Sequence, residues 1–255
     1  MMSTRFHDKV ILITGATSGI GRAVAERVSA EGAKVVLAAR GREAGEALAA
    51  TLHGEGRDVL FVPTDVTVGA EVERLVSTAV EHYGRIDGAF NNVGAATAYG
   101  PVADITEDAW SADLALNLNS VFFGLKYQIP ALQSAGGGAI VNNASNLGVT
   151  GAVGMASYSA AKHGVVGLTR SAALDTATAG VRINALITGG VDTPLLRGAM
   201  GANPADSIRA AGALHPVGRI AQPEEIAAFV AFLLSDEARF ITGAALAIDG
   251  GMTAA

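Results

Sequence analysis

The residues of this chain best suited to chemistry are a tyrosine and a lysine four positions apart, Tyr158 and Lys162. They lie in a stretch, S-Y-S-A-A-K-H-G-V-V-G-L, that predicts a helix, so both side chains should share one face, one turn apart. A free tyrosine has a pKa near 10, and a neighbouring ammonium group together with a cationic cofactor ring would lower it towards neutrality. The pair is therefore expected to work as an acid and base on a carbinol or a carbonyl group.

Two further polar residues are candidates for the same site. Ser145 follows a predicted strand over residues 139–143, and its hydroxyl could hold the oxygen that gains or loses the proton. Asn117 stands among apolar residues in L-A-L-N-L-N-S-V-F-F-G. It could be a satisfied core amide, or it could hold a water molecule and a helix carbonyl open for proton traffic. The residues alone favour the structural role.

The elements that would position these groups begin with a glycine-rich turn. Residues 10–14 (V-I-L-I-T) predict a strand, G-A-T-S-G-I-G follows, and residues 22–31 predict a helix. Glycines at 15, 19 and 21 remove side chains where the backbone must turn and where a pyrophosphate would approach the helix amides. This order of strand, glycine turn and helix predicts a dinucleotide site.

The end of the second predicted strand, residues 34–39, indicates which dinucleotide binds. A carboxylate there would accept a hydrogen bond from a ribose 2'-hydroxyl, whereas a guanidinium suits a 2'-phosphate. The strand ends in Ala39, and Arg40 follows it. This favours NADP, with NAD as the alternative; Arg40 could also be an ordinary solvated arginine.

Strand and helix patterns then alternate along the rest of the chain. Further strands are predicted at 59–63, 86–91, 139–143, 181–187 and 244–248, and helices at 41–53, 68–83, 106–131, 158–177 and 223–234. The alternation predicts one α/β domain over residues 1–255, a three-layer, doubly wound Rossmann-type parallel sheet of about seven strands with helices on both faces. Asp65, after the third strand, could accept from adenine, cap the next helix, or both. Residues 194–216 are small, irregular and weakly helical, and a substrate lid is expected over about residues 192–218.

Composition excludes several classes of protein. The formal net charge is -6 and no run of Lys or Arg occurs, so no nucleic-acid partner is expected. No apolar run approaches 18 residues and the first nine residues do not look like a signal peptide, which predicts a cytoplasmic protein without a membrane partner. The chain has no cysteine, which excludes disulfides and thiol catalysis, and its five histidines are scattered and predict no metal site.

With these residues in hand, the whole chain resembles the one-domain branch of the short-chain dehydrogenase/reductase family. The motifs that carry the resemblance are, in order, Thr14-Gly15-x3-Gly19-x-Gly21, Asp65, Asn91-Asn92-x-Gly94, Asn117, Ser145, Tyr158-x3-Lys162 and Thr193. The resemblance implies hydride transfer between a nicotinamide cofactor and a small ketone or secondary alcohol. Val149, Met155 and Leu195 are candidate substrate contacts and suggest a mainly apolar ligand.

The resemblance also implies a role for each site residue. Tyr158 would be the acid and base, Lys162 would lower its pKa and hold the nicotinamide ribose, Ser145 would orient the substrate oxygen, and Asn117 would hold a water linking Lys162 to solvent. The implied cofactor contacts are Gly15, Ser18, Gly19, Ile20 and Gly21 along the adenosine and pyrophosphate, Arg40 at the 2'-phosphate, Asp65 and Val66 at adenine, Asn91 at the adenosine ribose, Gly94, and Val191 and Thr193 at the carboxamide. A homotetramer is implied, with subunits meeting across the helices of Tyr158 and Asn117.

Three residues depart from the family pattern. Val93 replaces a usual alanine, with little expected consequence. Thr188 replaces the proline that usually precedes glycine, which is expected to loosen the turn beside the nicotinamide. Ser18 stands where many NADP-preferring members carry a basic residue, so the prediction of NADP depends on Arg40.

Other functions fit the sequence less well. A 3-oxoacyl-[acyl-carrier-protein] reductase would need a basic patch at its entrance, yet residues 129–139 contain no Lys or Arg and the active-site helix carries Leu174 on its outer turn. A dehydratase or epimerase of the extended branch would need a further substrate domain. A non-catalytic dinucleotide sensor would have no use for the three catalytic side chains, and no G-x-S-x-G motif surrounds Ser145 to suggest a serine hydrolase.

Overall fold

Seven parallel strands form one sheet in the order β3-β2-β1-β4-β5-β6-β7 in the computed structural model, which describes residues 4–199 and 204–254. The strands are β1 Val10–Thr14, β2 Lys34–Ala39, β3 Val59–Pro63, β4 Gly88–Asn91, β5 Gly138–Asn143, β6 Val181–Thr188 and β7 Ala245–Ile248. The chain order reverses its direction of growth between β1 and β4, as in a doubly wound sheet. The predicted fold class is confirmed.

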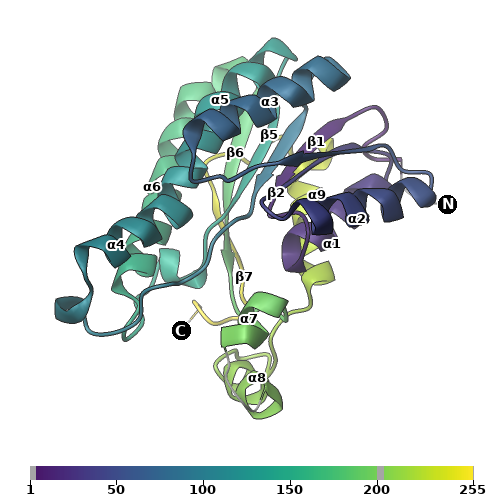
Figure 1. Cartoon of the computed structure of the whole chain (residues 1–255). Helices are drawn as coiled ribbons and strands as arrows, with labels where there is room; N and C mark the ends of the chain where they lie inside the picture. Colours follow the sequence, from purple (N-terminus) through teal and green to yellow (C-terminus); the bar gives the residue numbers. More distant parts are fainter. Residues whose placement is uncertain (1–3, 200–203, 255) are drawn as a thin grey trace.

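Helices cover both faces of this sheet (Figure 1). The α-helices are α1 Gly19–Ala30, α2 Arg42–Gly54, α3 Gly69–Tyr83, α4 Glu107–Leu114, α5 Ser120–Ser134, α6 Ala156–Thr176, α7 Pro194–Ala199, α8 Pro204–Ala213 and α9 Pro223–Leu234. Helices α1, α2 and α9 pack on one face, and α3, α5 and α6 pack on the other. Among the described residues, no helix is long and apolar enough to cross a membrane.

The strands are apolar on both sides because both faces of the sheet are covered. In β1, Ile11 and Ile13 belong to the core beneath α1 and α9, whereas Val10 and Leu12 belong to the core beneath α3, α5 and α6. This alternation follows from the two-residue repeat of a strand. The sheet is therefore a rigid platform, and its carboxyl edge is where the loops that carry the candidate site begin.

The segment predicted as one helix over residues 106–131 is helical from Glu107 to Ser134, so it ends three residues later than predicted, and it contains a π turn. Thr106 caps α4 as expected, accepting from the backbone N–H of Ala109 at 3.2 Å, but a π-helical turn over residues 115–119 separates α4 from α5. The side-chain amide of Asn117 donates to the carbonyl of Asp113 at 3.0 Å. Because this carbonyl lies four residues earlier, the side chain competes with the regular helical hydrogen bond. Single π turns are often found at functional sites.

The lid segment contains two short helices, in agreement with the weak helical pattern predicted for it. Helices α7 and α8 both lie beside the carboxyl edge of the sheet (Figure 1). Residues 200–203 of this segment lie outside the described residues. Beyond it, Pro223 begins α9 as predicted, reinforced by reciprocal capping between Gln222 and Glu225.

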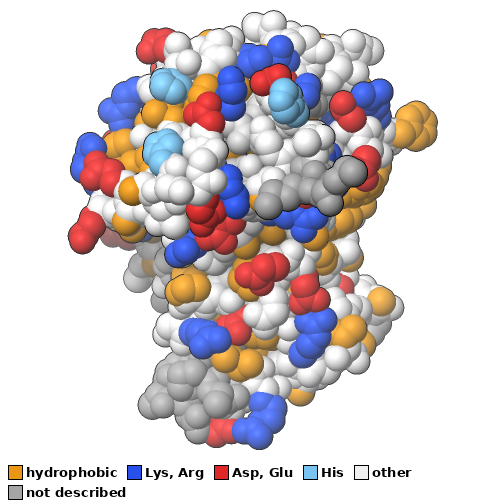
Figure 2. Space-filling view, turned by 90° about the vertical axis from the view of Figure 1, so that its right-hand side faces the viewer, with side chains coloured by type: hydrophobic (Ala, Val, Ile, Leu, Met, Phe, Trp, Pro, Cys, Tyr) orange, Lys and Arg blue, Asp and Glu red, His pale blue; other side chains and the backbone are white. Residues whose placement is uncertain are grey.

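On the face shown in Figure 2, positive and negative side chains are interspersed.

The small residues of α6 allow close packing at one position within the chain. A Cβ added at Gly164 would lie 2.9 Å from a methyl carbon of Leu118, so the π turn packs closely on α6. At Gly167 an added Cβ would meet nothing within 4 Å. Close packing within the chain therefore explains the glycine at position 164, whereas it does not explain the glycine at position 167.

Candidate active site

The glycine turn after β1 leaves the start of α1 accessible to an anion. Gly15 and Gly19 adopt φ angles of +64° and +52°, and a Cβ at Gly21 would lie 2.2 Å from the carbonyl oxygen of Gly15. Ser18 is the N-cap residue of α1 but makes no side-chain capping bond, and the first turn contains no acidic residue. These features fit a pyrophosphate at the helix N-terminus.

The loop after β6 meets this glycine turn. A Cβ built on Gly19 would lie 2.9 Å from the γ-carbon of Thr193, so the two predicted cofactor segments come into contact. Val191 is buried and forms an isolated β-bridge with Ala221, which fixes the loop from its other side. The structure thus brings together residues separated by more than 170 positions in the sequence.

Asp65 does not cap α3, and that part of its prediction is wrong. The N-cap residue is Val68, whereas one carboxylate oxygen of Asp65 accepts from the backbone and hydroxyl of Thr67 at 2.9 and 2.7 Å. These hydrogen bonds lower the pKa of Asp65, and the charge on Arg40 lowers it further. Arg40 is exposed at the end of β2, so its guanidinium and the Asp65 carboxylate share this part of the carboxyl edge. Val66 beside them is buried.

The side-chain amide of Asn91 makes its hydrogen bonds to other side chains. The amide nitrogen donates to Gln128 at 3.0 Å and to Asn142 at 2.9 Å, and the amide oxygen accepts from Gln128 at 2.8 Å. The predicted contact of Asn91 with the adenosine ribose stays a prediction. A contact with an adenosine ribose would have to come from the Asn91 backbone.

The predicted catalytic side chains gather at the carboxyl end of β5 and the start of α6. Lys162 is 1% exposed, its ammonium nitrogen donates to the carbonyl of Asn143 at 2.8 Å, and it lies 5.5 Å from the ring centroid of Tyr158. Ser145 donates to the side chain of Asn146 at 2.9 Å and accepts from the backbone of Leu147 at 3.2 Å.

Burial dominates the protonation of this pair. It raises the pKa of Tyr158 to about 12, with smaller contributions in the same direction from Tyr99 and Asp113, while a hydrogen bond with Ser145 acts to lower it. Burial also lowers the pKa of Lys162 to about 8. The lowering of the phenol's pKa by Lys162 together with a cationic cofactor ring stays a prediction, because the value of about 12 belongs to the chain without that ring.

Asn117 is fully hydrogen-bonded, as the structural interpretation predicted. Its side chain accepts from the backbone N–H of Ala95 at 2.9 Å and donates to the carbonyl of the same residue at 2.8 Å. Gly94 separates this side chain from the lysine: a Cβ at Gly94 would lie 2.9 Å from Asn117 Oδ1 and 2.8 Å from Lys162 Nζ. The water-holding role of Asn117 stays a prediction.

Asp113 is a site residue that the sequence reasoning missed. It is fully buried and accepts from Ser157 at 2.6 Å, from the backbone of Thr97 at 3.0 Å and from the hydroxyl of Thr97. Asp113 therefore ties the loop that leads to Tyr99 to the residue directly before Tyr158. An acidic residue one turn before Asn117, between apolar neighbours, was the available signal.

The residues expected to contact substrate lie around this group. Met155, at the start of α6, forms an isolated β-bridge with Gly100. Val149 and Leu195 are exposed by 43% and 59%, which is high for large apolar side chains, and Tyr99, which was not among the predicted substrate contacts, is exposed by 64%. From the C-terminal segment, the sulfur of Met252 accepts from the Asn146 side chain at 3.2 Å.

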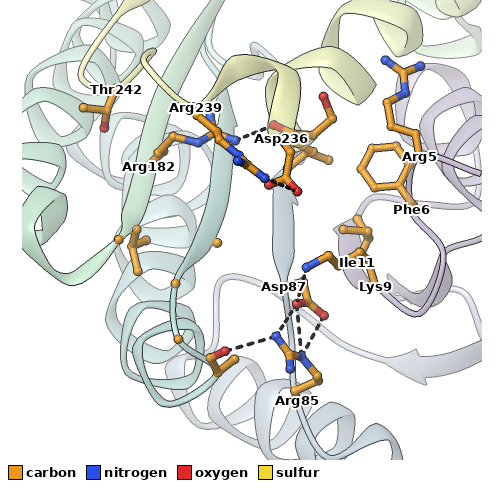
Figure 3. Close-up of a pocket in the computed structure, with 18 of the residues that line it drawn as sticks. Arg5, Phe6, Lys9, Ile11, Arg85, Asp87, Arg182, Asp236, Arg239 and Thr242 are labelled. Atoms are coloured by element: carbon orange, nitrogen blue, oxygen red, sulfur yellow. Dashed lines mark hydrogen bonds and ion pairs between the residues drawn. The ribbon is translucent and has the colours of Figure 1, made fainter.

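A cleft of about 400 Å³ lies at the opposite, amino edge of the sheet (Figure 3). Five of its charged groups pair with one another: Lys9 and Arg85 both contact Asp87, and Arg239 contacts Asp236. It contains none of the predicted site residues. Among the described residues, no group of three or more His, Asp or Glu could hold a metal ion.

Comparison with known proteins identifies a family and several relatives. Residues 15–253 match the family described as Enoyl-(Acyl carrier protein) reductase. Cyclohexanol dehydrogenase of Acinetobacter sp. (strain SE19) is 39% identical over 253 residues, covering 99% of this chain and 98% of that protein. Cis-4-hydroxycyclohexanecarboxylate dehydrogenase of Sinomonas cyclohexanicum is 41% identical over 253 residues, covering 99% of this chain and 100% of that protein.

The chain is a short-chain dehydrogenase/reductase. The crystal structure of levodione reductase has the same fold, with a TM-score of 0.94 and 41% identity over 98% of this short-chain dehydrogenase/reductase and 100% of that chain. Membership of the family makes the protein an oxidoreductase of CH–OH and carbonyl groups that uses NAD(P). The accessible start of α1, beside Thr193, is consistent with such a cofactor.

Proposed function

We propose that this protein interconverts ketones and secondary alcohols on six-membered carbon rings, with NADP as the preferred cofactor. The observation that carries the proposal is the placement of Tyr158, Ser145 and Lys162 together at the carboxyl edge of the sheet, where Thr193 meets the glycine turn. The related proteins named above support the choice of substrate, since two of them are named for cyclohexanol and a hydroxycyclohexanecarboxylate.

Side chains of the protein donate the proton to the substrate oxygen and accept it in the reverse reaction. A pKa of about 12 keeps the Tyr158 phenol protonated at neutral pH, so its hydroxyl can donate to a carbonyl oxygen that gains negative charge. Ser145 holds the same oxygen through its hydroxyl. The reverse reaction needs the phenolate, and its rate is expected to rise with pH. When bound, the nicotinamide supplies or accepts the hydride.

In this proposal Lys162 holds the nicotinamide ribose and stabilises negative charge on the Tyr158 oxygen. Its ammonium is held by the Asn143 carbonyl at 2.8 Å, which fixes it beside the Tyr158 ring and the predicted ribose site. Because its pKa is about 8, it is mostly charged at neutral pH and stabilises negative charge that develops on the Tyr158 oxygen. The charge is lost as the pH rises through 8.

The preference for NADP depends on Arg40. It is exposed beyond β2, and no ion pair of Arg40 occurs among the described residues, whereas the nearby Arg42 pairs with Glu46 at 3.3 Å. An unpaired guanidinium at this position suits a 2'-phosphate.

A substrate panel tests the proposed function. Cyclohexanone, cyclohexanol and open-chain ketones of the same carbon number are offered to the wild-type protein with NADPH and NADH. We expect the cyclic compounds to react faster, and Tyr158→Phe to lose about 100-fold or more in turnover while it still binds NADPH. Unchanged turnover in Tyr158→Phe, or a wild-type protein that binds NADPH and turns over no carbonyl, would contradict the proposal.

We also propose a homotetramer in the cytoplasm. Large apolar side chains are exposed on the helices that the resemblance places between subunits, with Phe122 on α5 exposed by 46% and Leu174 on α6 by 82%. Gly167 is open on the same helix as Leu174. Light scattering should give four chains for the wild-type protein and fewer for Phe122→Glu. Cell fractionation tests the compartment.

A further inference from the structure

His215 lies directly beyond α8, between the lid and the loop that follows β6. The ring is only 5% exposed, and both of its nitrogens have partners. Nδ1 lies 2.9 Å from the carbonyl oxygen of Ala211, and Nε2 lies 2.9 Å from the backbone nitrogen of Gly190. The imidazole therefore links the last turn of α8 to the loop.

The partners determine which nitrogen carries the proton. The backbone N–H of Gly190 can only donate, so Nε2 of His215 must accept. The carbonyl of Ala211 can only accept, so Nδ1 must carry the hydrogen. His215 is thus held as one neutral tautomer, and no other standard side chain offers a donor and an acceptor with this spacing.

The ring also fills the space beside the loop. A Cβ added at Gly189 would lie 2.7 Å from Nε2 of His215, and one added at Gly190 would lie 3.1 Å from Cε1. On the other side, a Cβ at Gly250 would lie 3.4 Å from the Cβ of His215. The imidazole is wedged between the turns that follow β6 and β7, so the turn at Gly189 and Gly190 cannot shift without displacing it.

This contact matters because Gly190 leads directly into two predicted cofactor contacts. Val191 is the next residue in the chain, and Thr193, two positions further on, reaches Gly19 of the glycine turn. The carbonyl of Gly190 accepts from Ala221 at 2.9 Å, so His215 and Ala221 hold the two sides of the same peptide segment. Thr188, expected to loosen this turn, has its hydroxyl 3.3 Å from the side chain of Asn143.

We propose that His215 is a positioning residue for the cofactor: its Nε2 holds the Gly190 backbone so that Val191 and Thr193 face the nicotinamide end of the dinucleotide, and its Nδ1 anchors that contact to α8. The inference rests on the proposed function, because the contact of Val191 and Thr193 with the nicotinamide end of the cofactor is itself part of that proposal. It assigns to the lid a structural link to dinucleotide binding in addition to its expected role at the substrate.

Two substitutions separate the two nitrogens. In His215→Gln the side-chain oxygen reaches the position of Nε2 and can accept from Gly190, but the bond to Ala211 is lost. In His215→Asn the amide reaches the position of Nδ1 and can donate to Ala211, but nothing reaches Gly190. Each variant is measured for NADPH affinity by fluorescence titration, for hydrogen exchange of the Gly190 amide and for thermal unfolding.

We expect His215→Asn to bind NADPH about tenfold more weakly and to exchange the Gly190 amide at least tenfold faster, because this half-buried N–H has lost its acceptor. His215→Gln should stay within about threefold of the wild-type affinity. With saturating NADPH, the KM for cyclohexanone should change less than twofold in both. Wild-type affinity in His215→Asn, or equal losses in both variants, would overturn the proposal.

A third variant leaves the histidine in place. In Gly190→Ala the added methyl group would lie 2.9 Å from Ile220 and 3.1 Å from the His215 ring, so the turn must move away. The same loss of NADPH affinity is expected, which keeps the test decisive if His215→Asn does not fold. Failure to reduce any ring ketone would contradict the proposed function, whereas the NADPH titrations would still decide the role of His215.

Discussion

The side chain of Thr193 lies directly against Gly19, so close that a Cβ built on Gly19 would stand 2.9 Å from its γ-carbon and 3.1 Å from its Cβ. One residue belongs to the turn after the first strand and the other to the loop after the sixth. Neither can move towards the other, and a side chain at position 19 would have to push this loop away.

The first prediction concerns this contact. Gly19→Ala should weaken NADPH binding about tenfold or more, because the methyl group displaces Thr193 and the φ of +52° is strained for alanine. Gly151→Ala is the control, since an added Cβ there meets nothing within 4 Å. Fluorescence titration measures both. Equal affinity for the two variants would show that the contact has no part in binding.

The second prediction concerns the choice of cofactor. Arg40→Asp should shift the ratio of kcat/KM with NADPH to that with NADH towards NADH by at least tenfold, since a carboxylate repels a 2'-phosphate and accepts from a 2'-hydroxyl. Arg42→Ala is the control, because Arg42 already pairs with Glu46. The argument from Arg40 fails if the ratio is the same in Arg40→Asp and in the wild-type protein.

The third prediction concerns pH and stability. The folded pKa of Lys162, about 8, is below its usual 10.5, so the folded protein loses this proton at a lower pH than the unfolded chain. The cost of burying the charge is present in full below pH 8 and is relieved as the pH rises from 8 to 10.5. Denaturant unfolding at pH 7.5 and 9.5 should show the wild-type protein gaining about 2 kcal/mol relative to Lys162→Met. Parallel pH profiles would mean that the lysine is not held in this way.

The fourth prediction concerns Asp113. Asp113→Asn should lower the free energy of unfolding by about 1–3 kcal/mol, because an amide cannot accept every hydrogen bond that Ser157 and Thr97 donate to the carboxylate. Removal of its negative charge should also lower the pKa of Tyr158, so the rise of alcohol oxidation with pH should begin at a lower pH. Asp108→Asn on the exposed start of α4 should change stability by no more than about 0.5 kcal/mol. If the pH profile of alcohol oxidation is the same in Asp113→Asn and in the wild-type protein, the charge of Asp113 does not affect the pKa of Tyr158.

Much of the fold follows from local patterns. Residues 10–14 form β1 as predicted because an apolar run ends at a glycine turn, and α9 begins at Pro223 because proline fits a first helical turn. The four-residue spacing of Tyr158 and Lys162 predicted one shared helix face, and the structure has both residues on α6 with the ammonium beside the ring.

The errors arise where distant segments meet. The pKa of Tyr158 could not be predicted because it depends on burial and on Tyr99 and Asp113, which come from other parts of the chain. His215 showed no motif because its partners, Ala211 and Gly190, are backbone groups. Backbone partners leave no pattern in a sequence.

The π turn at residues 115–119 gives the helix one residue more than its regular repeat. Loss of one codon there would restore the regular repeat and rotate Asn117 by about 100° relative to α5, away from Ala95. A change in length, rather than in residue type, would then disconnect Asn117 from the loop beside Lys162. The deletion of a single codon in this turn would therefore give a protein that keeps both helices and loses this connection.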